Sequence, residues 1–188
     1  MGLPLPVRRD ATYEDLKEVP SHLVAEIVDG ELYTSPRPGA PHALSTTRLV
    51  GAIDGPFGRG RGGPGGWLIL VEPELHLGPQ VMVPDLAGWR RARMPEMPEV
   101  AAFELAPDWI CEVTSPGTEA FDRSLKMPRY AEAGVEWAWI VDPRTRSLEV
   151  YQRRALHFHL VAQHRETALV RAAPFEAVEI ELGALWER

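Results

Sequence analysis

Three acidic side chains stand in or beside apolar segments of this chain, where a carboxylate is costly to bury. Glu26 lies in the run VAEIV, Asp85 in VPDLA and Glu112 in ICEVT. A buried carboxylate without a partner costs several kcal/mol, so each needs a cation, a hydrogen-bond donor or a proton. Acids that converge on one place repel each other unless a metal ion neutralises them. Clustered oxygen ligands of this kind suit Mg²⁺ or Mn²⁺.

Two of these acids have an ordinary structural explanation as well. Glu26 could lie on the solvent face of a two-sided hairpin. Asp85, which follows Pro84, could occupy a turn or begin a strand. Glu112 is harder to explain in this way, because it falls in the middle of the strand expected over residues 110–114, whose alternate side chains face opposite sides. The interpretation therefore stays open for the first two acids and favours a functional role for Glu112.

Lys126 is one of only two lysines in the chain and follows Glu112 closely in the sequence. A helix that packs back over the strand would direct this amine at the carboxylates. Arginine is used almost everywhere else, but lysine is the compact cation whose pKa changes readily on burial. The plain alternative is a surface pair with Asp122, one helical turn earlier, worth a few tenths of a kcal/mol. The same spacing places Arg129 on that helix face.

Other motifs carry weaker signals. The glycines of residues 55–66 have the spacing of a dinucleotide fingerprint, but a strand follows where a helix is required, so a loop is predicted. His157 and His159 share one face of a strand, yet zinc needs a third ligand and no partner is evident. His42 begins a helix and is either structural or close to the acids.

Composition indicates a single globular domain over residues 1–188. The chain is 45% hydrophobic and 25% charged, as in ordinary globular domains. A formal net charge of −7 argues against bulk electrostatic coating of nucleic acid or membranes, although it leaves room for a local basic groove. The lone Cys111 allows no disulfide within the chain, and no segment reads as a signal peptide or a membrane span. We expect a cytoplasmic protein with no membrane partner.

The elements that must position the acids alternate between helices and strands. We expect a helix over about 12–19, a hairpin around Asp29-Gly30, a helix from about Pro41, a loop over 55–66, a strand or hairpin over 67–78, a strand around Asp85, a strand over 108–115, a helix over 117–134, and further strands, the last of them AVEIEL over 177–182. Pro128 should kink or shorten the helix that Gly134 ends. This order predicts an α/β fold of the mixed-sheet (α+β) kind with helices on its faces.

Several stretches of the sequence resemble one protein family. They are TYEDL, AEIVDGEL, PDLAGW and the run from PDWICEVTSP to WIVDP, which together lie between Tyr13 and Tyr151. These stretches are similar to the Uma2 family, also called DUF820, whose members are described as restriction endonucleases. The resemblance implies a PD-(D/E)XK nuclease-like core, in which helices and additional strands flank a mixed central sheet and the site lies at a split in that sheet.

The resemblance also implies roles for the residues singled out above. Asp85 matches the PD element and Glu112 the acid of the second element, so both would be metal ligands. Glu26 matches the early acid of the family and would hold a metal directly or through a water. Thr114 takes the place of the usual nuclease lysine, and Lys126 from the next helix would supply the amine instead.

These roles imply metal-dependent hydrolysis of phosphodiester bonds by a DNA endonuclease. Mg²⁺ or Mn²⁺ would lower the pKa of a bound water, and Lys126 would orient that water or stabilise the transition-state charge. A homodimer would suit the cutting of two strands, by analogy only. The alternative is a nuclease fold kept as a binding or assembly module with weak or lost catalysis, which suits the net charge of −7 better than tight DNA binding.

Overall fold

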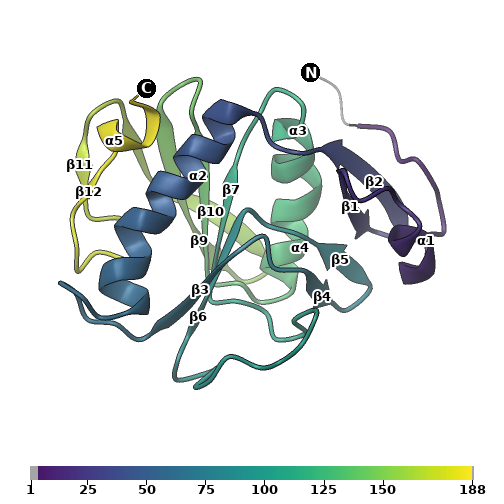
Figure 1. Ribbon diagram of the computed structural model, residues 1–188, viewed down its shortest axis with the longest axis horizontal. Helices are drawn as coiled ribbons and strands as arrows, with labels where there is room; N and C mark the ends of the chain where they lie inside the picture. Colours follow the sequence, from purple (N-terminus) through teal and green to yellow (C-terminus); the bar gives the residue numbers. More distant parts are fainter. Residues whose placement is uncertain (1–3, 188) are drawn as a thin grey trace.

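The computed structural model describes residues 4–187 (Figure 1). Its helices are α1 (Tyr13–Lys17), α2 (Ala40–Ile53), the π-helix η1 (Asp54–Gly58), α3 (Glu119–Phe121), the π-helix η2 (Asp122–Lys126), α4 (Met127–Glu132) and α5 (Gly183–Trp186). Its strands are β1 (Leu23–Val28), β2 (Glu31–Pro36), β3 (Trp67–Val71), β4 (Leu75–Leu77), β5 (Gln80–Met82), β6 (Leu86–Arg90), β7 (Trp109–Val113), β8 (Trp137–Asp142), β9 (Ser147–Arg154), β10 (His157–Arg165), β11 (Leu169–Val170) and β12 (Ile180–Glu181). Within the described residues, no helix has the length and apolar character needed to cross a bilayer.

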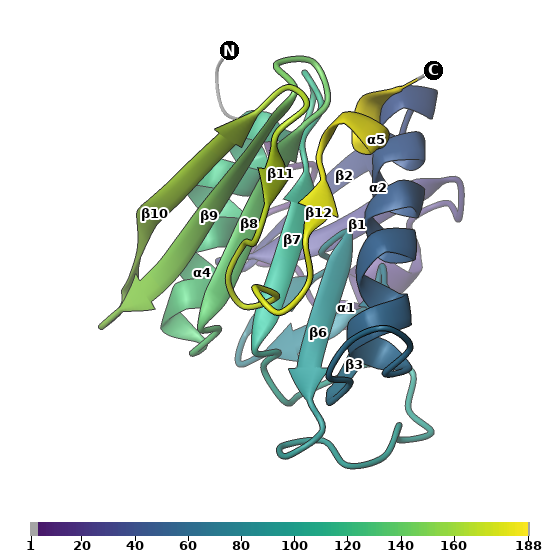
Figure 2. The ribbon, with the colours of Figure 1, turned by 90° about the vertical axis from the view of Figure 1, so that its left-hand side faces the viewer.

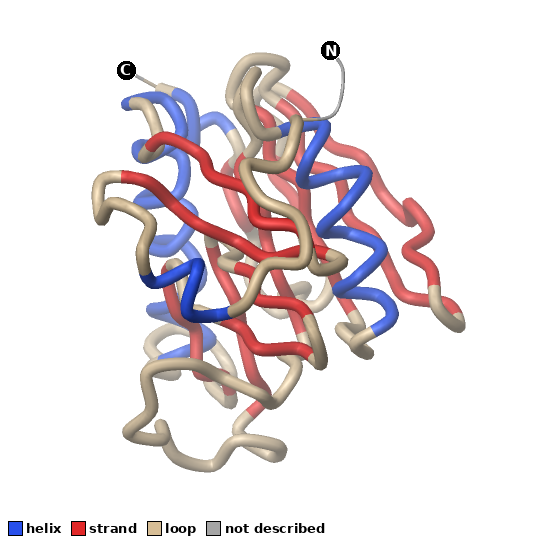
Figure 3. Tube along the Cα trace, turned by 90° about the vertical axis from the view of Figure 1, so that its right-hand side faces the viewer, coloured by secondary structure: helices blue, strands red, loops and turns tan. Residues whose placement is uncertain are grey.

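Two sheets form the framework. The larger sheet has the strand order β10-β9-β8-β7-β6-β3, and the smaller has the order β2-β1-β5-β4. Strands β7 and β8 run parallel while the other neighbours in the larger sheet are antiparallel. Figure 2 shows α2 on one face of the larger sheet and α4 on the other. Figure 3 shows the molecule from the side on which the smaller sheet lies in Figure 1. The predicted mixed sheet with flanking helices is confirmed.

Strand β7 lies inside the larger sheet and faces two separate cores. Cys111 and Val113 pack into the core under α2, whereas Ile110 packs into the core under α4. The predicted alternation along this strand is therefore confirmed. Glu112 shares the face of Ile110 and points toward the helix that carries Lys126, since a strand alternates its side chains.

The first helix and the hairpin follow the sequence prediction. The Thr12 side chain accepts a hydrogen bond from the backbone N–H of Asp15, whose carboxylate returns a bond to Thr12, and this capping box begins α1. Asp29 and Gly30 have φ values of 55° and 77°, as a two-residue hairpin turn requires. Helix α2 begins at Ala40, close to its expected start.

The single strand predicted around Asp85 is wrong, because this segment is divided between the two sheets. The chain leaves the smaller sheet at Met82 and enters the larger sheet at Leu86. Pro84 lies between them and has no N–H with which to continue a ladder. The carboxylate of Asp85 instead accepts a hydrogen bond of 2.7 Å from the backbone N–H of Val113. Asp85 therefore stands at the junction of the two sheets.

The loop predicted over residues 55–66 is wrong at its beginning. Residues 54–58 continue α2 as the π-helix η1, in which the N–H of Arg59 donates to the carbonyl of Asp54, five residues back. Phe57 within it is 2% exposed and packs into the core under α2. Burial of this aromatic ring outweighs the turn preference of the neighbouring proline and glycines, and the irregular loop begins only after it.

The helix predicted over 117–134 is divided by a second π-turn. The N–H of Met127 donates to the carbonyl of Asp122, five residues back, and this wider turn comes just before Pro128, which has no N–H to donate. The turn shifts the phase of the helix, so Arg129 faces outward and its guanidinium contacts Asp29 at 2.8 Å. The expectation that Arg129 shares a face with Lys126 is therefore wrong.

Candidate active site

The four residues predicted from the sequence meet in one cavity of about 240 Å³. Glu26 comes from β1, Asp85 from the junction of β5 and β6, Glu112 from β7 and Lys126 from η2. The cavity therefore lies where the smaller sheet, the larger sheet and the helix after β7 meet. Residues that are far apart in the chain share this one space.

Lys126 is the centre of the cluster and is 2% exposed. Its Nζ lies 2.8 Å from Glu26 Oε1 and 2.9 Å from Glu112 Oε1, and it donates to the carbonyl of Val83 at 2.9 Å. Burial alone would lower the pKa of Lys126, but the carboxylates of Glu112 and Glu26 outweigh burial and hold its pKa well above the ordinary value. Lys126 is thus a charged ammonium fixed by three oxygen atoms.

Glu26 does not lie on the solvent face of the hairpin, so that alternative is wrong. Its side chain is buried, and Oε1 accepts a hydrogen bond of 2.8 Å from the backbone N–H of Val83 in addition to the contact with Lys126. This carboxylate links β1 to the segment that leads to Asp85.

Glu112 is as deeply buried as Lys126. Burial raises its pKa well above the ordinary value, Lys126 opposes that rise, and the nearby carboxylates of Asp122 and Asp85 add to it. The hydroxyl of Tyr130 donates to Glu112 Oε1 at 2.9 Å. Burial also raises the pKa of Tyr130 well above its ordinary value, so this phenol keeps its proton and orients the carboxylate. Sequence reasoning did not place Tyr130 in the site.

Asp122 is a fourth carboxylate of the cluster, and the alternative of a surface pair with Lys126 is wrong. Its side chain is buried, and Oδ1 lies 4.0 Å from Lys126 Nζ. Burial raises the pKa of Asp122 to about 7, against the attraction of Lys126. The spacing of four residues before Lys126, on a helix that covers Glu112, is the signal that could have placed Asp122 in the site.

Replacing Asp122 by asparagine should stabilise the protein in neutral and basic solution. Because the folded-state pKa of about 7 lies above the ordinary value of 3.8, the folded state binds the proton more tightly and loses stability as the pH rises from 4 to 7. We expect Asp122→Asn to gain about 2–4 kcal/mol at pH 8 in EDTA and little at pH 4, measured by urea unfolding. Asp10→Asn at an exposed position is the control, and an equal gain at both pH values would contradict the raised pKa.

Asp85 is held by both of its carboxylate oxygens. Oδ1 lies 3.0 Å from His42 Nε2, and Oδ2 accepts the backbone bond from Val113. Burial would lower the pKa of His42, but its contact with Asp85 outweighs burial and raises it. Asp85 directly precedes β6, so it has the strand-entry position that the sequence left open. His42 contacts Asp85, so of its two alternatives the one close to the acids holds.

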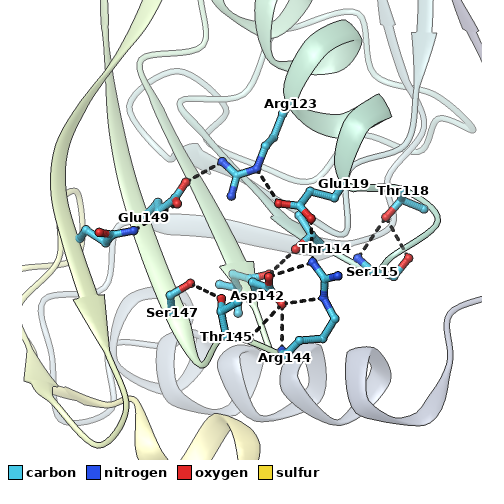
Figure 4. A network of polar contacts seen from close by, with 12 residues as sticks. Thr114, Ser115, Thr118, Glu119, Arg123, Asp142, Arg144, Thr145, Ser147 and Glu149 are labelled. Carbon is cyan, nitrogen blue, oxygen red and sulfur yellow. Dashed lines mark hydrogen bonds and ion pairs between the residues drawn. The ribbon is translucent and has the colours of Figure 1, made fainter. Parts of the chain in front are cut away.

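A second polar network fixes the segment between β7 and the helix that carries Lys126 (Figure 4). The guanidinium of Arg144 bonds to Asp142 at 2.9 Å and to Glu119 at 2.7 Å, which ties the end of β8 to the first turn of α3. Within the segment, the backbone N–H of Ser115 donates to the hydroxyl of Thr118 at 3.2 Å. These bonds hold the cavity wall and the start of the helix in place.

The donor set fits a hard divalent cation in its chemistry and charge. Four carboxylates face one lysine and one histidine, and the neighbouring carboxylates add to the rise that burial causes in the pKa values of Glu112 and Asp122. Oxygen donors of this kind are those that Mg²⁺ prefers. Lys126 now holds one oxygen each of Glu26 and Glu112. Across residues 4–187, no group of three or more His, Cys, Asp or Glu side chains is already arranged as metal ligands. A cation would therefore bind with rearrangement of these side chains.

The zinc alternative at His157 and His159 gains no support. Both side chains are exposed on β10, and the part of the chain that the structure describes provides no third ligand beside them.

Comparison with solved structures defines the class of fold. The chain is similar to a protein from Anabaena variabilis described as "a putative nuclease belonging to DUF820", with a TM-score of 0.75 and 20% sequence identity over 94% of this chain and 97% of the other. At this identity the likeness concerns the fold, which is the nuclease-like mixed α/β fold expected from the sequence.

The family follows from the sequence itself. The model of the Uma2 family, described as "Putative restriction endonuclease", matches residues 10–183. The chain therefore belongs to the Uma2 family, and the resemblance seen in the sequence is confirmed. No match was found among curated proteins. Family and fold together place the chain among nuclease-like proteins.

Proposed function

We propose that this protein is an endonuclease that hydrolyses phosphodiester bonds of DNA with Mg²⁺ or Mn²⁺. The observation that carries the proposal is the convergence of Glu26, Asp85, Glu112 and Lys126 on one cavity. Membership of the Uma2 family and the nuclease-like fold support it. A cytoplasmic location, where DNA is within reach, belongs to the same proposal.

Each side chain has a defined task in this proposal. Asp85 and Glu112 would hold the cation with Glu26 as a third acid, and the cation would supply an activated water and neutralise phosphate charge. Lys126 presents a fixed ammonium to the reacting phosphate and stabilises charge that develops in the transition state. Tyr130 orients Glu112 through the hydrogen bond to Oε1.

His42 would act through Asp85 rather than on the substrate. Its contact with Asp85 Oδ1 and the backbone bond to Oδ2 fix the plane of that carboxylate. A fixed ligand keeps its oxygens aimed at one position, and outer contacts of this kind typically change metal affinity or activity 10- to 100-fold.

The proposal is tested by cleavage of supercoiled plasmid and linear duplex DNA in Mg²⁺, Mn²⁺ or EDTA. We expect cleavage by the unsubstituted protein in either metal and none in EDTA. Asp85→Ala, Glu112→Ala and Lys126→Ala should each lower the rate by at least about 100-fold. Glu14→Ala removes an exposed carboxylate and should leave the rate unchanged. Cleavage that persists in all three site variants would have another source and would contradict the assignment.

A second candidate is a binding or assembly module with weak or lost catalysis. The observation that favours it is the pairing of Lys126 with Glu26 and Glu112, which already neutralises part of the cluster without a metal. Under this alternative no DNA is cut in either metal, while the chain forms a stable homodimer or binds a protein partner. The cleavage assay separates the two candidates, because a homodimer is compatible with both, and sedimentation velocity then shows whether a protein that cuts no DNA assembles.

A further inference from the structure

We infer that Arg37 binds a phosphate of the nucleic-acid backbone at the mouth of the cavity, an inference that rests on the proposed function. Arg37 follows β2 on the segment that leads from the smaller sheet to α2, and it lines the same cavity as the buried acids. Its side chain is 55% exposed, whereas that of Lys126 is 3% exposed. The two cations therefore lie at different depths of one cavity.

An anionic backbone that approaches this cavity meets an excess of negative charge. Among the described residues that line it, the basic side chains are Arg37, His42 and Lys126. Lys126 is held by two carboxylates and His42 by Asp85. Arg37 is thus the cation that solvent, and hence a large substrate, reaches first.

The present contacts of Arg37 are weak enough to exchange. Its Nη1 lies 3.4 Å from Glu72 Oε2, and Nη2 donates to the carbonyl of Ser21 at 3.1 Å. Exposed ion pairs contribute about 0–1 kcal/mol, so Glu72 would give up this partner at little cost. A guanidinium presents parallel N–H donors that match two phosphate oxygens.

The backbone around Arg37 is stiff. Pro36 precedes it and Pro38 follows it. Each proline fixes its own φ, and Pro38 also restricts the conformation of Arg37 before it. The segment therefore presents the guanidinium at a set place on the rim, which lowers the entropy lost when a phosphate binds.

Binding of a fluorescently labelled DNA duplex, followed by anisotropy in Ca²⁺ and again in EDTA, tests this inference without cleavage. We expect Arg37→Ala to weaken binding about tenfold and to reduce the salt slope by about one, and Arg37→Lys to weaken it about threefold. The matched control is Arg59→Ala, because Arg59 is also exposed and paired with a carboxylate, Asp54, but does not line the cavity. It should change binding by less than about twofold.

Two results would overturn the inference: equal effects of Arg37→Ala and Arg59→Ala, or no DNA binding by the unsubstituted protein. If DNA is bound through Arg37 but never cut, the proposed catalysis fails while the role of Arg37 stands. Thermal unfolding of each variant verifies that it is folded.

Glu72 provides an independent test. Glu72→Gln frees Arg37 from its carboxylate partner and should tighten DNA binding about threefold. In the Arg37→Ala background the same change should tighten binding clearly less, because only the general loss of negative charge remains. The same gain in both backgrounds would show that Glu72 acts without Arg37 and would count against the proposed site.

Discussion

Replacing Lys126 by methionine should destabilise the protein by about 3–5 kcal/mol and abolish DNA cleavage. Removal of one partner from a buried ion pair leaves the other charges uncompensated. Here Glu26 and Glu112 would both lose an ammonium that lies within 2.9 Å of their oxygens. Methionine keeps most of the side-chain volume, so the loss of stability results from the missing charge rather than from poorer packing. It should be larger at pH 8 than at pH 5, because the stranded carboxylates take up protons in acid.

The chain supplies the control for this experiment in its other lysine. Lys17 is half exposed and lies 2.6 Å from Glu14 on the surface. Lys17→Met should change the free energy of unfolding by no more than about 0.5 kcal/mol and leave cleavage intact. Urea unfolding at both pH values provides the measurement. If both variants lose a similarly small free energy of unfolding, Lys126 is not the cation that stabilises the cluster of acids.

Glu112→Gln should abolish cleavage as well, but without a loss of stability. Burial raises the pKa of Glu112 well above its ordinary value. The folded protein therefore binds this proton more tightly than the unfolded chain does, and the free energy of unfolding falls as the pH rises above about 4.5. Glutamine removes that charge and retains an oxygen to accept from Tyr130 and Lys126. We expect stability at pH 8 equal to or above that of the unsubstituted protein. The cleavage rate should fall at least about 100-fold, since a proposed metal ligand is lost.

The matched control is Glu132→Gln, which removes an exposed carboxylate from α4, the helix that covers Glu112. It should affect neither cleavage nor the pH dependence of unfolding. If Glu112→Gln lowers stability and cleavage together, Glu112 is chiefly a structural partner of Lys126, and its proposed role in holding a cation is wrong.

Strand β7 could be predicted from the sequence because local pattern alone decides it. Apolar residues surround Glu112 on both sides, and period-two alternation assigns its direction once the strand is recognised. The hairpin at Asp29 and Gly30 is equally local, since positive φ at both positions follows from the residue types. These predictions needed no knowledge of the rest of the fold.

The place of Asp85 could not be predicted in the same way. Whether the segment from β5 to β6 continues in one sheet or changes sheets depends on the other strands, which no local pattern describes. Pro84 predicts an interruption of the strand, but it does not predict that the chain then enters the other sheet. The bond from Val113 to Asp85 exists only because β6 pairs with β7.

The sequence analysis did not place Tyr130 in the site for a different reason. The π-turn before Pro128 changes the phase of the helix, and a regular 3.6-residue period therefore assigns wrong directions beyond it. Arg129 was expected on the helix face of Lys126, whereas Tyr130 lies on that side and donates to Glu112. One wide turn thus decides which residues after Lys126 reach the cavity.

Calorimetric titration of Mn²⁺ and Mg²⁺ at pH 8 tests the central claim most directly, because it asks whether the cluster of buried acids is a cation site at all. We predict that the unsubstituted protein binds either ion, that Asp85→Asn and Glu112→Gln bind neither, and that Glu14→Gln binds as the unsubstituted protein does. An unsubstituted protein that binds neither ion, or site variants that bind them undiminished, would contradict the account.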